Sequence, residues 1–340
     1  MTIKTAMSPI MRVGAALAVL WTVASAALAR GVVERERIVV TVSDVDRAQH
    51  FYRDGLGFET VGRAEAEGEG FAYPVGLRDG RAKTRSIRLG REEVTFVQYE
   101  PLGKPVPAAS GSPDLWFQHF AIVVWDMDRD SAYARLQQVG FASISEARPV
   151  TLAPANGSVR AFKFRDPDGH PLELLYFPPG QGRGVWSGSA DKLFLGVDHS
   201  AIGVADSARS EGFYEKLFGM AVAYRSLNRG PTQESLDGTF GTVVQITGLL
   251  PPTQSGPGVE FLEYRTPATG RPAPVDTQSN DIVHVELAFE VDDLDGLIPK
   301  LRDAHVPFVS PDEVDLGGGV RAAMVRDPDG HAFVLEERRR

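Results

Sequence analysis

Residues 159–170, VRAFKFRDPDGH, recur 161 positions later as residues 320–331, VRAAMVRDPDGH. A second pair of segments, residues 42–58 and 204–220, shares a Val-x-Asp start and a Phe-Tyr pair at an offset of 162. Two nearly equal offsets over separate segments predict an internal duplication. In each Asp-Pro-Asp-Gly segment the proline fixes φ and the glycine permits a positive φ, which is typical of a tight turn between two strands.

Each half of the duplication divides into two similar units, so the chain is predicted to hold four modules: residues 30–100, 115–178, 192–265 and 281–340. Each module opens with a short strand, at residues 37–42, 119–124, 199–204 and 286–291. An aspartate then marks the expected helix start: Asp44, Asp126, Asp206 or Asp293. Further strand-like runs follow, among them residues 93–99, 160–164 and 172–177. The predicted module is βαβββ, and the predicted fold class is α+β.

The first 29 residues have the pattern of a secretory signal peptide. Lys4 and Arg12 precede an uncharged, mostly apolar run that ends in Ala27-Leu28-Ala29, a small-x-small cleavage pattern. Cleavage after Ala29 predicts export to the periplasm or the extracellular space, and retention as a membrane anchor is the alternative. Cleavage would change the net charge from −9 to −11 and would leave no segment apolar enough to span a membrane.

The composition excludes several kinds of site and partner. The 340 residues include no cysteine, which excludes disulfides, thiolate zinc sites, iron–sulfur clusters and a cysteine nucleophile. The acidic balance argues against nucleic acid as the main partner, since phosphate binding relies on Lys and Arg. Any metal must therefore be held by His, Asp, Glu or water. We expect a small-molecule substrate, and nothing in the sequence indicates an oligomeric state.

This layout resembles the vicinal oxygen chelate superfamily, which includes glyoxalase I, bleomycin-resistance proteins and extradiol dioxygenases. The resemblance rests on the two Arg-Asp-Pro-Asp-Gly-His turns, the Phe-Tyr helices and Asp198-His199 in the third module. It covers nearly the whole mature chain as four modules. It implies that the modules pair into two curled mixed sheets around pockets. It also implies a divalent metal (Zn, Ni, Mn, Co or Fe(II)) held by one residue in the first strand and one in the last strand of each module.

The inner modules keep complete ligand pairs at the family's positions. The first-strand position lies seven residues before the aspartate of the helix start, which gives His119 and His199. The last-strand position lies four residues after the turn glycine, which gives Glu173 in the second module. In the third module the strand Glu-Phe-Leu-Glu-Tyr resembles the family's last strand and selects Glu260. The predicted metal ligands are therefore His119, Glu173, His199 and Glu260.

The outer modules do not keep such pairs. The same positions hold Arg37 and Thr95 in the first module and Glu286 and Val334 in the fourth, and Val334 has no ligand atom. Glu286 and His284, which share one face of a strand, are weaker candidates for ligands. If the second and third modules share a pocket, the four inner residues converge on one metal. If the modules pair in chain order, two incomplete sites result; we favour the shared pocket because the losses then fall in the outer modules.

Three functions fit these residues. The first is a glyoxalase- or epimerase-like enzyme, in which a metal polarises a substrate oxygen and, by resemblance to glyoxalase I, Glu173 or Glu260 transfers a proton. The second is an extradiol ring-cleaving dioxygenase that uses Fe(II), two histidines and one glutamate; the second glutamate argues against it. The third is a non-catalytic protein that binds a small molecule, as resistance proteins do.

Overall fold

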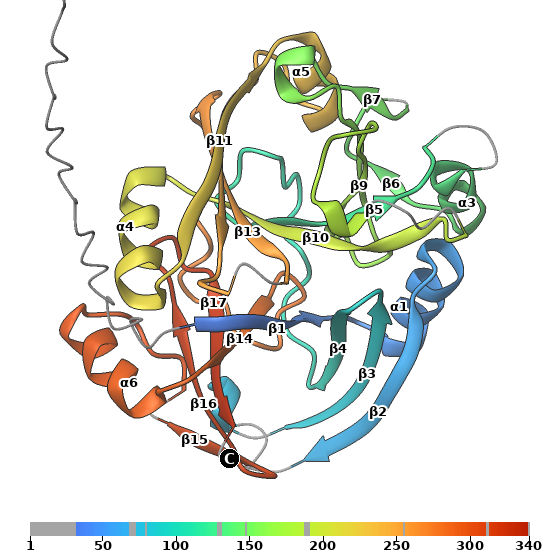
Figure 1. Ribbon diagram of the computed structural model, residues 1–340. Helices are drawn as coiled ribbons and strands as arrows, with labels where there is room; N and C mark the ends of the chain where they lie inside the picture. The colour runs from blue at the N-terminus through green and yellow to red at the C-terminus, as the bar shows by residue number, and fades with distance from the viewer. Residues whose placement is uncertain are drawn as a thin grey trace, which may run out of the picture.

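The chain folds into two curled mixed sheets with helices between them (Figure 1). The computed structural model describes residues 32–67, 73–78, 80–127, 131–146, 148–186, 191–253, 256–310 and 313–338. The predicted signal peptide, residues 1–29, lies outside the described residues. Among the helices of the described segments, none is long and apolar enough to cross a membrane.

Each module has the predicted βαβββ order, with short additions. The first contains β1 (Val32–Thr41), α1 (Val45–His50), the π-helical turn η1 (Phe51–Gly55), β2 (Glu59–Glu67), the 3-10 turn η2 (Tyr73–Val75), β3 (Arg81–Leu89) and β4 (Glu92–Glu100). The second contains β5 (Phe117–Val124), α3 (Ala132–Val139), β6 (Ala142–Ser143), β7 (Val150–Thr151), η3 (Pro154–Asn156), β8 (Arg160–Arg165) and β9 (Pro171–Tyr176). The turn η4 (Gly184–Trp186) lies in the connection to the third module.

The second half of the chain repeats this order. The third module contains β10 (Phe194–Gly203), α4 (Ser207–Phe218), β11 (Ala221–Arg229), α5 (Pro231–Asp237), β12 (Val243–Leu250) and β13 (Gly258–Thr266). The fourth contains β14 (Val285–Val291), α6 (Leu294–Asp303), β15 (Val314–Gly317), β16 (Val320–Arg326) and β17 (Ala332–Arg338). The predicted α+β class, with modules paired into two curled mixed sheets, is confirmed.

The modules do not pair as first with second and third with fourth. The eight-stranded sheet joins the fourth and first modules in the order β15-β16-β17-β14-β1-β4-β3-β2. The nine-stranded sheet joins the third and second modules in the order β11-β12-β13-β10-β5-β9-β8-β6, with β7 paired to β8. Each sheet is joined across its middle by two antiparallel first strands, β1 with β14 and β5 with β10. Of the two pairings that the sequence leaves open, the second module thus pairs with the third.

Strand alternation decides which side chains enter the core between the sheets. On β5, Phe120 and Ile122 are buried in the main core, whereas His119 and Ala121 face the other way. Tyr52 from the first module is fully buried in the same core, and its ring lies 6.0 Å from that of Phe120. Figure 1 shows α1 with α3, and α4 with α6, as two groups between the sheets, whereas α5 lies at the top near β7. His119 therefore lies on the face of the nine-stranded sheet that is turned away from this core.

One of the four predicted helices begins later than the aspartate near which its start was expected. The side chains of Asp44, Asp206 and Asp293 accept backbone N–H bonds at the N-termini of α1, α4 and α6, as expected. Asp126 does not cap α3, which begins at Ala132 with Ser131 at its N-terminus. The connection between β5 and α3 is longer than the matching connections in the other modules. Asp126 is therefore too far from the start of α3 to cap it.

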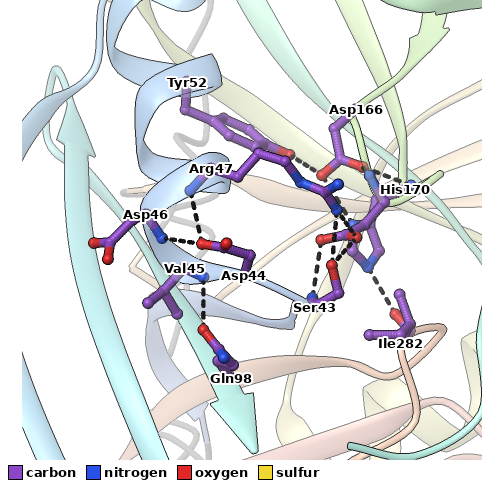
Figure 2. Close-up of polar contacts among 11 residues, drawn as sticks. Ser43, Asp44, Val45, Asp46, Arg47, Tyr52, Gln98, Asp166, His170 and Ile282 are labelled. Atoms are coloured by element: carbon purple, nitrogen blue, oxygen red, sulfur yellow. Dashed lines mark hydrogen bonds and ion pairs between the residues drawn. The ribbon is translucent and has the colours of Figure 1, made fainter.

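The two Asp-Pro-Asp-Gly-His turns tie the sheets together. His170 Nδ1 lies 2.9 Å from Asp166 Oδ2, and its Nε2 lies 2.7 Å from the carbonyl oxygen of Ile282, which precedes β14 in the other sheet (Figure 2). The Tyr52 hydroxyl donates to the same Asp166 carboxylate at 3.1 Å. In the second turn, His331 Nε2 lies 2.8 Å from the carbonyl oxygen of Gly203. Both histidines are buried turn residues engaged in structural contacts.

Candidate metal centre

The four predicted ligands lie on the face of the nine-stranded sheet that is turned away from the core. Ala201 on β10 pairs with both Glu260 on β13 and His119 on β5, so these three residues form one row across the sheet. Glu173 on β9 pairs with Ala121 on β5, two residues along from His119. Since residues i and i+2 share a face of a strand, all four side chains project to one side. The small alanines between them leave room above the sheet.

Three of the four bring their ligand atoms close together. One ligand atom each from His119, Glu173 and His199 lies within 4.8 Å of the others, and all three residues are buried. His119 Nε2 lies 3.1 Å from Glu173 Oε2, and His199 Nε2 lies 3.2 Å from Glu260 Oε2. The two imidazole rings are 5.5 Å apart between centroids. Residues from two modules thus converge on one point.

Within the described part of the chain, three of the four ring nitrogens of His119 and His199 make no hydrogen bond of good geometry, although the two Nε2 atoms lie 3.1 and 3.2 Å from glutamate oxygens. These three atoms are both ring nitrogens of His119 and Nε2 of His199, and all are buried. A buried polar atom without a partner costs free energy, so such atoms are rare unless a ligand uses them. Two imidazoles and a carboxylate are a donor set that suits Fe, Ni, Zn or Co. The residues present therefore fit a divalent transition metal.

Asp198 orients the second histidine. Its Oδ2 lies 3.1 Å from His199 Nδ1, and its Oδ1 accepts bonds from Arg183 Nε at 2.9 Å and Trp186 Nε1 at 2.6 Å. A carboxylate on one imidazole nitrogen aims the other nitrogen at a metal, an arrangement usual around metal ligands. From the sequence, Asp198 is recognised only as part of the Asp198-His199 motif, without a role of its own. Its position directly before a predicted ligand is the signal that pointed to it.

Burial and the neighbouring charges act against each other in this group. Burial lowers the pKa of His119 below its ordinary value, with Glu173 opposing the shift. Burial also disfavours the charged form of His199, but Glu260 and Asp198 outweigh it and raise its pKa to about 9. Burial would raise the pKa of Glu173, but His119 and Lys163 outweigh it and lower the pKa to about 2. Glu173 is therefore a carboxylate at neutral pH, the form that binds metals.

Glu260 stands slightly apart from the other three. It is not within the group whose ligand atoms lie mutually close, and its Oε1 accepts a hydrogen bond from the Tyr224 hydroxyl on β11. The Tyr224 ring lies over Gly248 on β12, where a Cβ atom would come within 2.2 Å of the ring. A glycine is thus required for the tyrosine to reach Glu260. Tyr224 was not predicted from the sequence. The one signal for it is Gly248, because a glycine inside a strand often marks a close approach by another group.

A cavity of about 430 Å³ opens above these residues. Its volume is in the range of small-molecule sites. Besides the four predicted ligands, it is lined by Lys163 on β8, which is buried and bonded through Nζ to Asp237 Oδ1 at 2.6 Å. Asp237 ends α5, a helix that the predicted βαβββ module does not contain. A lysine alternating with Phe162 and Phe164 on a buried strand is the signal that could have marked this position.

The weaker candidates lie elsewhere. Glu286 is on β14 and His284 directly precedes that strand, in the eight-stranded sheet. His284 Nε2 lies 2.9 Å from Glu286 Oε1, so the two residues bind each other. The structure does not bring them to the group around His119.

Comparison with known proteins agrees with this fold. A family model described as the Glyoxalase/Bleomycin resistance protein/Dioxygenase superfamily matches residues 35–174 and 196–335. Among curated proteins, none matches the chain in sequence.

Solved structures show the same arrangement at low sequence identity. Glyoxalase I from Zea mays superposes with a TM-score of 0.57 at 15% identity, over 89% of this chain and 92% of that one. A putative dioxygenase from Bacillus subtilis subsp. subtilis str. 168 superposes with a TM-score of 0.55 at 14% identity, over 91% of this chain and 86% of that one. At such identities the likeness extends to the fold alone.

Proposed function

The chain belongs to the glyoxalase/bleomycin resistance protein/dioxygenase superfamily, and from that premise we propose a metal-dependent enzyme of the glyoxalase or epimerase type. The observation that carries the proposal is the buried group of His119, Glu173 and His199 at the base of a cavity, with Glu260 beside it. The substrate is a small, oxygen-rich molecule that chelates the metal. One divalent metal per chain is expected.

The roles of the four residues follow from their positions. A divalent cation, when bound, supplies a Lewis acid that polarises a carbonyl oxygen and stabilises the negative charge developing on it. His119 and His199 would hold it through Nε2, and Glu173 through a carboxylate oxygen. Glu260 accepts the proton from the carbon next to the carbonyl and returns it to the product. Tyr224 holds the Glu260 carboxylate in place for that transfer.

Deuterium exchange tests this role. Protein loaded with Ni²⁺ or Zn²⁺ is incubated with hydroxyacetone in D₂O, and NMR follows deuterium uptake at the carbon next to the carbonyl. We expect uptake by the wild type, retained metal without uptake in Glu260→Gln, and loss of both in Glu173→Gln. Equal uptake by wild type and Glu260→Gln would contradict the role of Glu260 as base.

One observation favours a second candidate, a ring-cleaving dioxygenase that uses Fe(II). The closely grouped residues are two histidines and one carboxylate, a set typical of non-haem Fe(II) oxygenases, and Tyr224 binds the fourth residue. An oxygen electrode with Fe(II)-loaded protein and catechol discriminates between the two. Oxygen uptake would select the dioxygenase; ligand binding without either activity would select a binding protein.

Export is a separate part of the proposal. We infer from Lys4, Arg12 and the apolar run that follows them that the enzyme works in the periplasm or outside the cell. N-terminal sequencing of the protein from its host should find a chain that begins at Arg30. A chain that still begins at Met1 in the membrane fraction would support the anchor instead.

A further inference from the structure

The cavity also indicates what kind of substrate body it accepts. We propose that the substrate is an uncharged molecule whose metal-binding end carries two oxygens and whose remaining body is apolar. This substrate class rests on the proposed function, because the oxygens are placed by the metal. The inference about the body is drawn from the residues that line the walls of the cavity, away from the metal ligands.

The walls above the metal group are mainly apolar. They come from both modules that form the nine-stranded sheet, and from α5: Leu152, Val159, Leu175, Phe177, Leu236 and Ile246. Leu175 and Leu236 are buried within one small apolar cluster, against which Val159 and Phe177 pack. Covering such surface with an apolar ligand is favourable by about 25 cal/mol for each Å² removed from water. Burial of an apolar substrate body in this cavity therefore favours binding.

The two cations on the walls are already paired. Among the described residues that line the cavity, the lysines and arginines are Lys163 and Arg183. Lys163 is bound to the fully buried carboxylate of Asp237. Arg183 donates to Asp198 and to the carbonyl oxygen of Gly256, and its guanidinium lies 5.2 Å from the Trp186 ring centroid. An anionic substrate group would have to separate the buried Lys163–Asp237 pair, which is costly, or draw Arg183 away from Asp198 in a partly exposed pair.

The balance of charge points the same way. Four carboxylates lie at or beside the cavity, from Glu173, Asp198, Asp237 and Glu260, against the two cations of Lys163 and Arg183. A divalent metal brings the group to neutrality. A carboxylate or phosphate on the substrate body would then be a buried charge without a partner, which proteins avoid.

Four polar side chains along one wall of the cavity are hydrogen-bonded to one another or to Asp237, whereas the Tyr264 hydroxyl, which also lines the cavity, is buried without a hydrogen-bond partner among the described residues. Gln233 Nε2 donates to Asp237 Oδ2 at 2.9 Å, and Asn228 Nδ2 donates to Gln233 Oε1 at 3.1 Å. Asn156 and Ser226 both donate to Asn228 Oδ1. This chain of bonds begins at Lys163 and runs along one wall. Its members are held in place by one another, so the wall is rigid and does not call for a charged ligand group.

Two probes with one chelating end and different bodies test the proposal. Zn²⁺-loaded protein is titrated by calorimetry with 4-tert-butylcatechol, whose body is apolar, and with 3,4-dihydroxybenzoate, whose body is a carboxylate. We expect the tert-butyl probe to bind at least about tenfold more tightly, because the carboxylate finds no unpaired cation. Equal or tighter binding of the dihydroxybenzoate would overturn the proposal.

Two variants sharpen the test by adding an unpaired cation. Asp237→Asn releases Lys163 from its carboxylate, and Val159→Lys places a new cation on a half-buried part of the wall without disturbing Lys163. Each should shift the preference toward dihydroxybenzoate by about tenfold. Val61→Lys, at an exposed position on the other sheet, adds the same charge and should leave the preference between the two probes unchanged. An unchanged preference in a folded Val159→Lys variant would contradict the inference.

Comparison with metal-free protein separates this inference from the proposed function. If the two probes differ as expected but bind equally well with and without Zn²⁺, the metal role fails and the apolar body stands. If both probes need the metal and bind equally, the body inference fails and the metal role stands. Binding of neither probe at millimolar concentration would contradict both.

Discussion

The two sheets present the same strand order, and their outer faces differ at all four predicted ligand positions. On the nine-stranded sheet the row across β13, β10 and β5 is Glu260, Ala201 and His119. The matching row across β4, β1 and β14 of the eight-stranded sheet is Thr95, Val39 and Glu286. A second row of that sheet, across β1, β14 and β17, is Arg37, Ala288 and Val334, where the other sheet has His199 and Glu173.

The eight-stranded face pairs its charges internally. Arg37 forms a two-bond ion pair with Glu336 on β17, and Glu286 is bound to His284. Val75 and Leu77 pack against buried Val97 and Tyr99 on the same face. The nine-stranded face instead places two histidines and two glutamates beneath a cavity, and three of the histidine nitrogens make no hydrogen bond of good geometry within the described segments. The comparison teaches that two sheets with one strand order can carry different faces: one pairs its charged side chains, and the other gathers two histidines and two glutamates beneath a cavity.

Removing one histidine should have the largest effect. In His119→Ala or His199→Ala we expect metal affinity to fall at least about a thousandfold, beyond the 10- to 100-fold typical for partners outside the ligand shell. Arg37→Ala, at the matching position of the other sheet, should leave affinity unchanged. Competition titration with a chromogenic chelator measures all three. Partial, independent losses in the two histidine variants would indicate separate sites.

The buried ion pairs of the two faces should differ in strength. Lys163→Met leaves the Asp237 carboxylate, 0% exposed, without its partner, and we expect a loss of about 3–5 kcal/mol in the free energy of unfolding. Arg37→Met breaks a pair whose arginine is 26% exposed and should cost about 1–3 kcal/mol. Chemical denaturation of both variants gives the two values. A smaller loss in Lys163→Met than in Arg37→Met would show that α5 is not held by this pair.

The aspartate behind His199 should have an intermediate effect. Asp198→Asn keeps the size of the side chain but weakens its bond to His199, and we expect metal affinity to fall about 10- to 100-fold. Metal titration followed by calorimetry measures this change. An affinity equal to that of the wild type would show that the protein positions His199 without Asp198.

The smallest effect is expected at Tyr224. Tyr224→Phe removes the hydrogen bond to Glu260 and should cost about 1 kcal/mol of stability. Metal affinity should change by no more than about threefold, whereas deuterium exchange should fall by about tenfold if Tyr224 holds the base in place. Exchange at the wild-type rate would mean that Glu260 needs no such support.

The placement of residues 119, 173 and 199 on one face of their strands could be predicted from the sequence. The resemblance to the superfamily supplies the counts from the aspartate after the first strand and from the turn glycine that select these positions, and strand alternation then places them on one face. The pairing of modules could not be derived this way, because it depends on contacts between strands far apart in the sequence. Asp126 shows the limit for local signals: an aspartate after a strand resembles a helix cap even where the connection is longer.

The contacts that adjust the site were the least predictable. Lys163 meets Asp237 across the boundary between the second and third modules, and Tyr224 reaches Glu260 from a neighbouring strand pair. Neither contact leaves a repeating pattern in the sequence, since each depends on how two elements lie in space. The internal repeat identifies what the modules share, and these residues differ between modules.

The metal content of the purified chain tests the central claim most directly. Elemental analysis by mass spectrometry, after purification and removal of loosely bound ions, counts metal ions per chain. We predict one transition metal per chain, held on the nine-stranded sheet by His119, Glu173 and His199. A value near zero, or a value near two from a further site on the eight-stranded sheet, would contradict the account.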